Sequence, residues 1–164
     1  MRDIAQAAAM LPGSLYYHFS AKEDLLVAVY EEGVRRISQG ARSAACGRTE
    51  PWERLEAAAV AHLEALLGGS DYAQVVIRIL PKDVPKVASR LIRLRDGYER
   101  LFAELIAALP LPKETERRTL RLMLLGALNW SQSWFRADGK ATPRSVARSY
   151  IRLLRNAQFL KGQP

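Results

Sequence analysis

The chain has 164 residues, of which 49% are hydrophobic and 26% are charged, and its formal net charge is +8. This composition is that of an ordinary globular protein of one or two domains, and it excludes a disordered or collagenous chain. No apolar run approaches the roughly 18 residues that span a bilayer, and the N-terminus lacks the pattern of a signal peptide. We therefore expect a cytoplasmic protein without a membrane partner.

Side chains that could carry out chemistry are scarce. Cys46 is the only cysteine, and His18 and His62 are the only histidines, so we expect no disulfide, no metal site and no cofactor. His18 has no carboxylate or nucleophile at a usable spacing, and the chain contains neither a glycine-rich phosphate loop nor a nucleophile beside a base. The sequence predicts no catalytic residue and no enzyme.

The positive charge lies outside the N-terminal part. Residues 1–33 contain two basic and five acidic side chains, whereas the chain from Lys140 onward contains six basic side chains and no acidic one. Clustered basic side chains favour nucleic-acid binding because they release counterions from phosphates. Because of this distribution, the net charge by itself supports DNA binding only weakly.

Helical periodicity runs through almost the whole chain, and no segment shows the alternation of a β-sheet. Clusters of proline and glycine interrupt the periodicity and delimit roughly eight helices. We predict an all-α fold.

Residues 2–19 predict two short helices separated by a tight turn. Ile4, Ala5 and Ala8 on the first helix and Leu15 and Phe19 on the second form a small apolar face, and the alanines let the helices cross closely. The second helix otherwise displays small, hydroxyl and aromatic side chains with almost no charge. Such a helix suits insertion into the major groove of DNA, as in a helix-turn-helix.

Ser20 and Glu23 have the spacing of a capping box. In this motif the Ser20 hydroxyl accepts a hydrogen bond from the Glu23 amide, and the Glu23 carboxylate accepts one from the Ser20 amide. The helix that begins there presents apolar residues at core spacing and is expected to run on toward Ala45.

Two later segments differ in how much of their surface is apolar. Residues 84–109 carry apolar residues at three- and four-residue steps, which predicts an amphipathic helix of a bundle. A second helix is predicted over residues 113–136, and its residues 120–135 are apolar around most of the circumference. More than one face of this helix must therefore be covered, and a partner subunit would provide the additional cover.

Thr142 and Pro143 predict a hydroxyl cap followed by a helix from residue 143 to about 159. This helix carries a stripe of four arginines, Arg144, Arg148, Arg152 and Arg155. The stripe is a solvated face of an interface helix, a contact with an acidic neighbour or anionic ligand, or part of an interfacial membrane helix.

Other residues also leave alternatives open. His62 lies on the apolar face of a helix that begins near Pro51, where it is either a core histidine bonded to a neighbour or part of a ligand cavity. Trp130, Trp134 and Phe135 either pack in the core and a dimer interface or form an aromatic cage.

The run RDIAQAAAMLPGSLYYHFSAKEDLLVAV, from Arg2 to Val29, resembles the DNA-binding signature of TetR-family transcription regulators. The resemblance includes the Tyr-Tyr-His-Phe core and the lysine that follows it. It implies that three side chains approach bases, namely Arg2, Ser14 and Tyr17. It implies that three others bind phosphates, namely Tyr16, His18 and Lys22, and it places Gly13 at the DNA as well.

Three features depart from the family pattern. Ala9 stands where the family has glycine and Leu11 where it has serine or threonine, and each replacement costs about 1 kcal/mol. The family also carries a further helix before this motif. The resemblance therefore implies an incomplete, N-terminally truncated three-helix DNA-binding domain. Three explanations stay open for the missing helix: a start site assigned too late, a shortened product or a real loss.

The resemblance implies a partial helix-turn-helix domain over residues 1–32 and a larger helical-bundle domain for effector binding and dimerisation over residues 33–164. The residues expected to line the effector cavity are His62, Leu66, Tyr72, Val76, Ile79, Tyr98, Phe102 and Met123. Those expected in the dimer interface are Leu120, Leu124, Ala127, Leu128, Trp134, Val146, Tyr150, Leu153 and Leu154.

We therefore expect a homodimeric regulator that binds a palindromic operator in double-stranded DNA and is a repressor released by a small hydrophobic or acyl-CoA-like effector. The stretch from Gly126 to Ala147 also resembles a subgroup tied to lipid, steroid or acyl-CoA catabolism. Two alternatives stay open. One is a helical ligand-binding module of the same family that has lost DNA binding, and the other is a repressor of multidrug efflux genes.

Overall fold

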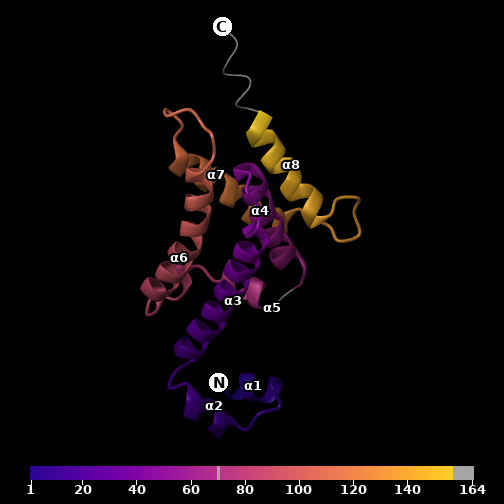
Figure 1. The fold of residues 1–164 in the computed structure, drawn as a ribbon. Helices are drawn as coiled ribbons and strands as arrows, with labels where there is room; N and C mark the ends of the chain where they lie inside the picture. Colours follow the sequence, from indigo (N-terminus) through magenta and orange to yellow (C-terminus); the bar gives the residue numbers. More distant parts are fainter. Residues whose placement is uncertain (70, 157–164) are drawn as a thin grey trace.

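The computed structural model describes residues 1–69 and 71–156, which form helices joined by turns (Figure 1). No strand occurs among these residues, which confirms the predicted all-α fold. The elements are α1 (Arg2–Ala7), α2 (Pro12–His18), α3 (Lys22–Ala45), α4 (Pro51–Leu67), α5 (Asp71–Arg78), η1 (Pro81–Asp83), α6 (Ala88–Ala107), α7 (Arg117–Trp130), η2 (Ser131–Ser133) and α8 (Pro143–Asn156). None of these helices has the length and apolar character needed to cross a membrane.

The long helix α3 connects the N-terminal segment to the bundle. Its buried residues, among them Val27, Tyr30, Val34, Ile37 and Ala41, recur at three- and four-residue steps and form one apolar stripe. The stripe packs against α4, α5 and α6. Figure 1 shows α1 and α2 at the N-terminal end of α3, away from the other helices. Residues 19–21 join α2 directly to α3.

Buried side chains gather in two clusters. The larger cluster joins α4, α6, α7 and α8 to the C-terminal part of α3, and its fully buried members include Leu55, Phe102 and Leu128. Burial of one such side chain contributes about 2 kcal/mol. The smaller cluster joins the N-terminal half of α3 to the start of α6, through Val27, Tyr30, Val34, Val87 and Leu91.

A close approach at Gly33 fixes α5 against α3. A Cβ atom at this position would lie 2.6 Å from Val76 Cγ2 and 2.8 Å from the carbonyl oxygen of Tyr72. The Arg36 guanidinium lies 4.4 Å from the centre of the Tyr72 ring, which adds a cation–π contact between the same helices. Only glycine leaves α5 room at this distance.

The start of α8 follows the sequence prediction. The Ser145 amide donates to Thr142 Oγ1 over 3.1 Å, so the threonine caps the helix that Pro143 begins. The buried residues Val146, Ala147 and Ile151 belong to the larger cluster, and α8 packs along α4. The predicted extension to residue 159 lies outside the described residues.

The capping box predicted at Ser20 and Glu23 is wrong. The helix begins one residue later, with Ala21 as the N-cap and no side-chain bond to the helix end. Ser20 donates instead to Asp24 Oδ2 over 2.5 Å. With Ala21 at the N-cap, no side chain among the described residues accepts a hydrogen bond from the amides of the first turn of α3.

Two predicted helices are shorter than expected. The segment 84–109 becomes helical only from Ala88, because Val84 precedes Pro85 and a residue before proline disfavours the α conformation. The segment 113–136 is helical from Arg117 to Trp130. Two hydroxyl groups bond to carbonyls at its C-terminal end, namely Ser131 to Ala127 and Ser133 to Trp130. Side-chain bonds of this kind compete with helix continuation.

The predicted domain boundary between residues 32 and 33 falls inside α3, which continues across it without a break. The two predicted domains therefore share one helix.

Candidate DNA-binding surface and effector cavity

The helix α2 is anchored by one residue and exposes the rest. Leu15 is 5% exposed and holds the helix on its neighbours, whereas Tyr17 on the opposite side is 86% exposed. All the residues predicted to contact DNA are exposed and lie on α1, α2 or the first residue of α3; they are Arg2, Gly13, Ser14, Tyr16, Tyr17, His18 and Lys22. This surface can therefore approach a groove without unfolding.

The turn between α1 and α2 has the strain that the sequence predicts. Ala9 has a φ of +52°, in the left-handed region that glycine adopts at little cost. The Met10 amide donates to the Ala5 carbonyl over 2.8 Å and closes the turn. Leu11 is the N-cap of α2 and provides no side-chain hydrogen bond. Both departures from the family pattern thus reduce the stability of this turn.

Two acidic side chains of residues 1–33, Glu23 and Glu32, are paired with basic side chains. Glu23 lies 3.1 Å from Lys86 Nζ, and a backbone hydrogen bond together with this lysine lowers the pKa of the Glu23 carboxyl. Hydrogen bonds from Arg35 and Arg36 lower the pKa of Glu32 to about 2. These pairs offset part of the acidic excess of the N-terminal segment, which reduces its repulsion of a phosphate backbone.

A cavity of about 420 Å³ lies among α3, α4, α5, α6 and α7. Its walls come from both buried clusters, since Tyr30 and Val34 belong to the smaller one and Leu66 and Leu125 to the larger one. Most of the lining side chains are apolar. The lining residues are Tyr30, Val34, Ile37, His62, Leu66, Val76, Ile77, Arg78, Ile79, Leu80, Arg95, Tyr98, Glu99, Leu125, Gly126, Asn129, Trp130 and Gln132.

A directional chain of hydrogen bonds crosses one wall of the cavity. His62 Nε2 lies 3.1 Å from Asn129 Oδ1, and His62 Nδ1 lies 2.7 Å from the Tyr98 hydroxyl. Burial lowers the pKa of His62 to about 4, so the ring is neutral at physiological pH. Because the Asn129 oxygen can only accept, Nε2 carries the proton and Nδ1 accepts from Tyr98. Burial raises the pKa of the Tyr98 hydroxyl and keeps it a donor.

His62 therefore fits both alternatives that the sequence left open. It is buried and hydrogen-bonded to neighbours, and it also lines the cavity. Its ring stacks on Tyr98 with a centroid distance of 5.8 Å and meets Phe102 edge-on at 6.0 Å. These contacts fix the orientation of the ring in the wall.

The mouth of the cavity carries positive charge. Arg78 and Arg95 line it and are exposed to solvent. Glu99 lies 3.7 Å from Arg95 Nε and 3.6 Å from a terminal nitrogen of Arg121, so one carboxylate stands between two guanidinium groups. The groups around the mouth leave an excess of positive charge, which favours an anionic group of a ligand.

Five of the eight residues predicted to line a cavity do so, namely His62, Leu66, Val76, Ile79 and Tyr98. The other three do not. Tyr72 packs under Arg36 on the side of α5 that faces α3, Phe102 lies in the core behind His62, and Met123 is 55% exposed on the outer side of α7. Periodicity indicates that such residues share an apolar face, but it does not distinguish a cavity wall from solid core.

Several lining residues were missed. Tyr30, Val34 and Ile37 come from α3, for which the sequence predicted a long helix with a core-facing side but no part in a cavity. The signal for them is the three- and four-residue spacing of buried residues along that helix. Arg78 and Arg95 carried no sequence signal, because nothing in their spacing separates them from other surface arginines.

The predicted dimer residues separate into three groups by their exposure within one chain. Leu124, Leu128 and Val146 are at most 7% exposed within one chain, so this part of the prediction is wrong: these side chains pack in the subunit's own core. Trp134 and Leu153 are exposed and accessible to a partner. The remaining residues are partly buried, namely Leu120, Ala127, Tyr150 and Leu154. Three further apolar residues of α7 are exposed within one chain, namely Leu122, Met123 and Trp130.

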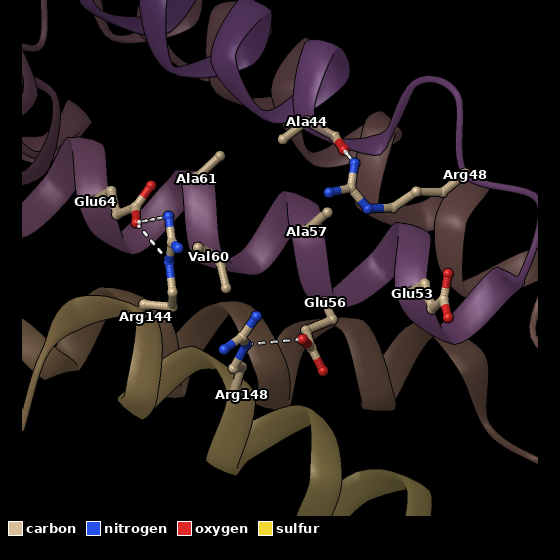
Figure 2. A pocket seen from close by; sticks show the side chains of 10 residues that line it. All are labelled: Ala44, Arg48, Glu53, Glu56, Ala57, Val60, Ala61, Glu64, Arg144 and Arg148. Atoms are coloured by element: carbon tan, nitrogen blue, oxygen red, sulfur yellow. Dashed lines mark hydrogen bonds and ion pairs between the residues drawn. The ribbon is translucent and has the colours of Figure 1, made fainter.

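A second hollow, of about 360 Å³, lies between α4 and α8 and is charged rather than apolar (Figure 2). Arg144 donates through Nε and Nη2 to Glu64 Oε1, over 3.2 and 3.0 Å, and Arg148 donates to Glu56 over 3.1 Å. The first half of the arginine stripe thus contacts an acidic neighbour, which was one of the alternatives. Because these arginines already have carboxylate partners, the hollow is a weaker candidate for a ligand than the apolar cavity.

Comparison with known families covers most of the chain. Residues 1–29 match the family described as bacterial regulatory proteins, tetR family. Residues 48–157 match the family described as tetracyclin repressor-like, C-terminal domain. The first match therefore covers α1, α2 and the start of α3, and the match to the C-terminal domain covers α4 to α8, which include most helices around the cavity.

Individual relatives are more distant. The HTH-type transcriptional repressor KstR2 of Mycobacterium tuberculosis is 26% identical over 163 residues, with 94% of this chain and 80% of KstR2 covered. The superantigen PfiT superposes with a TM-score of 0.77 and 28% identity, covering 93% of this chain and 82% of PfiT. AibR, solved in complex with isovaleryl coenzyme A and operator DNA, superposes with a TM-score of 0.76 and 22% identity, covering 92% of this chain and 84% of the AibR chain. At this identity the similarity to AibR is one of fold alone.

Proposed function

Since the chain belongs to the TetR family of bacterial transcription regulators, we propose that it is a repressor that leaves its operator when an effector occupies the cavity. The family consists of regulators rather than enzymes, in agreement with the sequence prediction. Its members bind operator DNA and are typically homodimers. The proposal concerns the finer points, namely the repressor role, the site of the effector and its chemistry.

The observation that carries the proposal is the course of α3. This helix begins at Lys22, next to the recognition helix α2, and the same helix supplies Tyr30, Val34 and Ile37 to the cavity wall. An occupant that displaces α3 would change the separation of the two recognition helices in a dimer. Half-sites about one helical turn of DNA apart would then no longer be spanned together.

The cavity supports an effector with an apolar body and an anionic group. The apolar side chains of α3, α5 and α7 would surround the body, while Arg78 and Arg95 at the mouth would meet the anionic group. An acyl-CoA ester has both parts, with phosphates for the arginines. The AibR structure contains isovaleryl coenzyme A, which agrees with this class of effector. On this basis we propose that the regulated genes belong to lipid or acyl-CoA catabolism.

The proposal can be tested by fluorescence anisotropy with labelled DNA from upstream of the chain's own reading frame. Isovaleryl-CoA and lauroyl-CoA should release the protein from this DNA, whereas free coenzyme A should not. The variant Ile79→Trp fills the cavity, so it should bind DNA and resist release. The control is Ile92→Trp, the same replacement at an exposed position of α6 outside the cavity, which should behave like the wild type.

Two other outcomes would redirect the proposal. If a neutral hydrophobic dye releases the DNA and the acyl-CoA esters are inert, the efflux-gene alternative is favoured. If the protein shows no specific, salt-dependent retention of the DNA, the alternative of a ligand-binding module without DNA binding is favoured. The thin packing of the N-terminal segment supports that alternative, because Ala5 and Leu15 are its only buried residues before α3 among those described.

A further inference from the structure

We propose that Asn129 binds the carbonyl oxygen of an acyl ligand through its Nδ2 amino group, and that His62 and Tyr98 hold the Asn129 carboxamide in position for this contact. The inference rests on the proposed effector function of the cavity. It deepens that function, because it makes the carbonyl group of the effector a requirement for tight binding, in addition to the apolar body and the anionic group.

The direction of the hydrogen-bond chain determines which donor is left free. Tyr98 donates to His62 Nδ1 over 2.7 Å, and His62 Nε2 donates to Asn129 Oδ1 over 3.1 Å. In the opposite direction, the Tyr98 hydroxyl would accept from His62, and its proton would need a second acceptor, of which the described residues provide none. The chain therefore ends on Asn129, with the carboxamide oxygen engaged.

The Asn129 amino group is available at the cavity. Asn129 lines the cavity and is exposed to solvent within one chain. Within the described part of the chain, Nδ2 has no hydrogen-bond acceptor. An amide NH2 group has two N–H donors and accepts no hydrogen bond, so it is complementary to a ligand oxygen that accepts, such as a carbonyl.

Aromatic contacts fix the direction of this donor. The His62 ring is 5% exposed, stacks on Tyr98 at a centroid distance of 5.8 Å and meets Phe102 edge-on at 6.0 Å. Tyr98 and Phe102 also meet each other edge-on at 5.6 Å, one turn apart on α6. The held ring orients the Asn129 carboxamide through its oxygen. A donor that is already oriented loses little conformational entropy when a ligand binds.

The position of Asn129 suits a group between an apolar body and an anionic group. Leu125 lines the cavity one turn before Asn129 on α7 and is only 6% exposed, so α7 passes from the buried apolar wall to the exposed part of the cavity between these residues. Arg95 and Glu99 line the mouth on either side of Tyr98 along α6. An acyl-CoA ester has the same order, with an apolar chain, a carbonyl group and then the part that carries the phosphates.

Gln132 is the other carboxamide that lines the cavity, and it provides a matched comparison. It lies on η2, and no hydrogen bond from the described residues fixes its carboxamide. The two residues thus bring the same chemical group to one cavity, and His62 orients only that of Asn129.

The test compares two ligands by calorimetry on the protein without DNA. Lauroyl-CoA is a thioester, and S-dodecyl-CoA is the thioether of the same chain length, in which a methylene group replaces the carbonyl. The wild type should bind lauroyl-CoA about tenfold more tightly, because the thioether covers the Asn129 amino group without accepting its hydrogen bond. Asn129→Leu should abolish this preference. Gln132→Leu, the matched control, should change both affinities together and keep the preference.

His62→Phe tests the positioning role of the histidine. Phenylalanine retains an aromatic ring beside Tyr98 but forms no hydrogen bond with Asn129. The substitution should weaken the binding of lauroyl-CoA several-fold more than that of S-dodecyl-CoA, because only the thioester depends on the orientation of the carboxamide. A purely structural role of His62 would change the two affinities equally.

Infrared spectroscopy provides a measurement that needs no substitution. Lauroyl-CoA labelled with carbon-13 at the carbonyl gives a distinct stretching band. In the wild-type complex this band should lie at lower frequency than that of an alkyl thioester with the same label in an apolar solvent, because a hydrogen bond to the oxygen weakens the C=O bond. A band at the apolar-solvent frequency would overturn the inference.

The other outcomes separate the inference from the proposed function. Equal affinities of the wild type for the two ligands, a preference that survives in Asn129→Leu, or one that is lost in Gln132→Leu would overturn the inference and leave the effector cavity standing. A preference that survives in His62→Phe would overturn the positioning role. If Ile79→Trp binds lauroyl-CoA as tightly as the wild type does, the ligand lies elsewhere and the proposed effector cavity itself fails.

Discussion

Protonation of His62 should control the stability of the fold in mild acid. The ring is 5% exposed, and Nε2–H donates to Asn129 while Nδ1 accepts from Tyr98. Burial lowers the pKa of His62 from its usual 6.5 to about 4 in the folded chain. As the pH falls below 6.5, the unfolded chain therefore takes up a proton that the folded chain does not. The contribution of neutral His62 to stability is complete above pH 6.5 and is lost as the pH falls toward 4.

The expected loss follows from the two pKa values of His62. Relative to neutral pH, proton uptake at this site lowers the free energy of unfolding by about 1 kcal/mol at pH 5.5 and by about 2–3 kcal/mol at pH 4.5. The variant His62→Gln cannot titrate at this position. It should be less stable than the wild type at pH 7.5, by about 1–3 kcal/mol, because the buried hydrogen bonds are imperfectly replaced. This difference should shrink as the pH falls.

The assay is urea unfolding followed by helical circular dichroism at several pH values, with a fixed protein concentration because dimerisation contributes to stability. Carboxylates such as Glu32 and the second histidine, His18, are present in both proteins, so the difference between the two proteins isolates His62. A stability difference that stays constant from pH 7.5 to 4.5 would refute the buried, neutral state of this histidine.

Three further predictions concern other parts of the chain. Tyr17→Ala should weaken operator binding by at most a few kcal/mol in anisotropy titrations and leave the melting temperature unchanged, because Tyr17 is 86% exposed; unchanged binding would mean that α2 is not the recognition helix. Gly33→Ala should lower the free energy of unfolding by about 1–3 kcal/mol, because the added Cβ would lie 2.6 Å from Val76 Cγ2. Gly40→Ala in the same helix has open space and should raise the free energy of unfolding by up to about 1 kcal/mol. Equal effects of the two substitutions in denaturant unfolding would contradict the close α3–α5 contact. Arg144→Ala should lower the free energy of unfolding by less than about 1 kcal/mol in the same assay, because the ion pair of Arg144 with Glu64 is solvent-exposed. This decrease should be smaller in high salt. A larger decrease that does not depend on salt would show that the pair is not a surface contact.

The sequence was most informative where local rules decide the structure. The spacing of apolar residues predicted the burial of Ala5 and Leu15 in two short helices, and the resemblance to the family identified these helices as a helix-turn-helix. The positive φ of Ala9 was implied by the glycine that the family has at this position. Thr142 and Pro143 began a helix as predicted. Ser20 is not the cap that its spacing predicted, since the helix begins one residue later and the Ser20 hydroxyl donates to Asp24.

The cavity and the exposed faces depended on how the helices pack against one another. Periodicity placed Leu124 and Met123 on an apolar helix, but it did not indicate which side meets the subunit's own core. Leu124 is 2% exposed and Met123 is 55% exposed, so their predicted roles in the interface and the cavity do not match where they lie. The contribution of Tyr30 to the cavity was missed because it depends on the separation of α3 from α6, which no local pattern in the sequence specifies.

Occupancy of the cavity and binding of the operator should oppose each other. The most direct measurement is the dissociation constant of lauroyl-CoA, determined by calorimetry for the free protein and for the protein saturated with operator DNA. Lauroyl-CoA should bind the DNA complex at least tenfold more weakly than the free protein. By linkage, bound lauroyl-CoA should lower the affinity for the operator by the same factor. Equal dissociation constants for the free and the DNA-bound protein would contradict it.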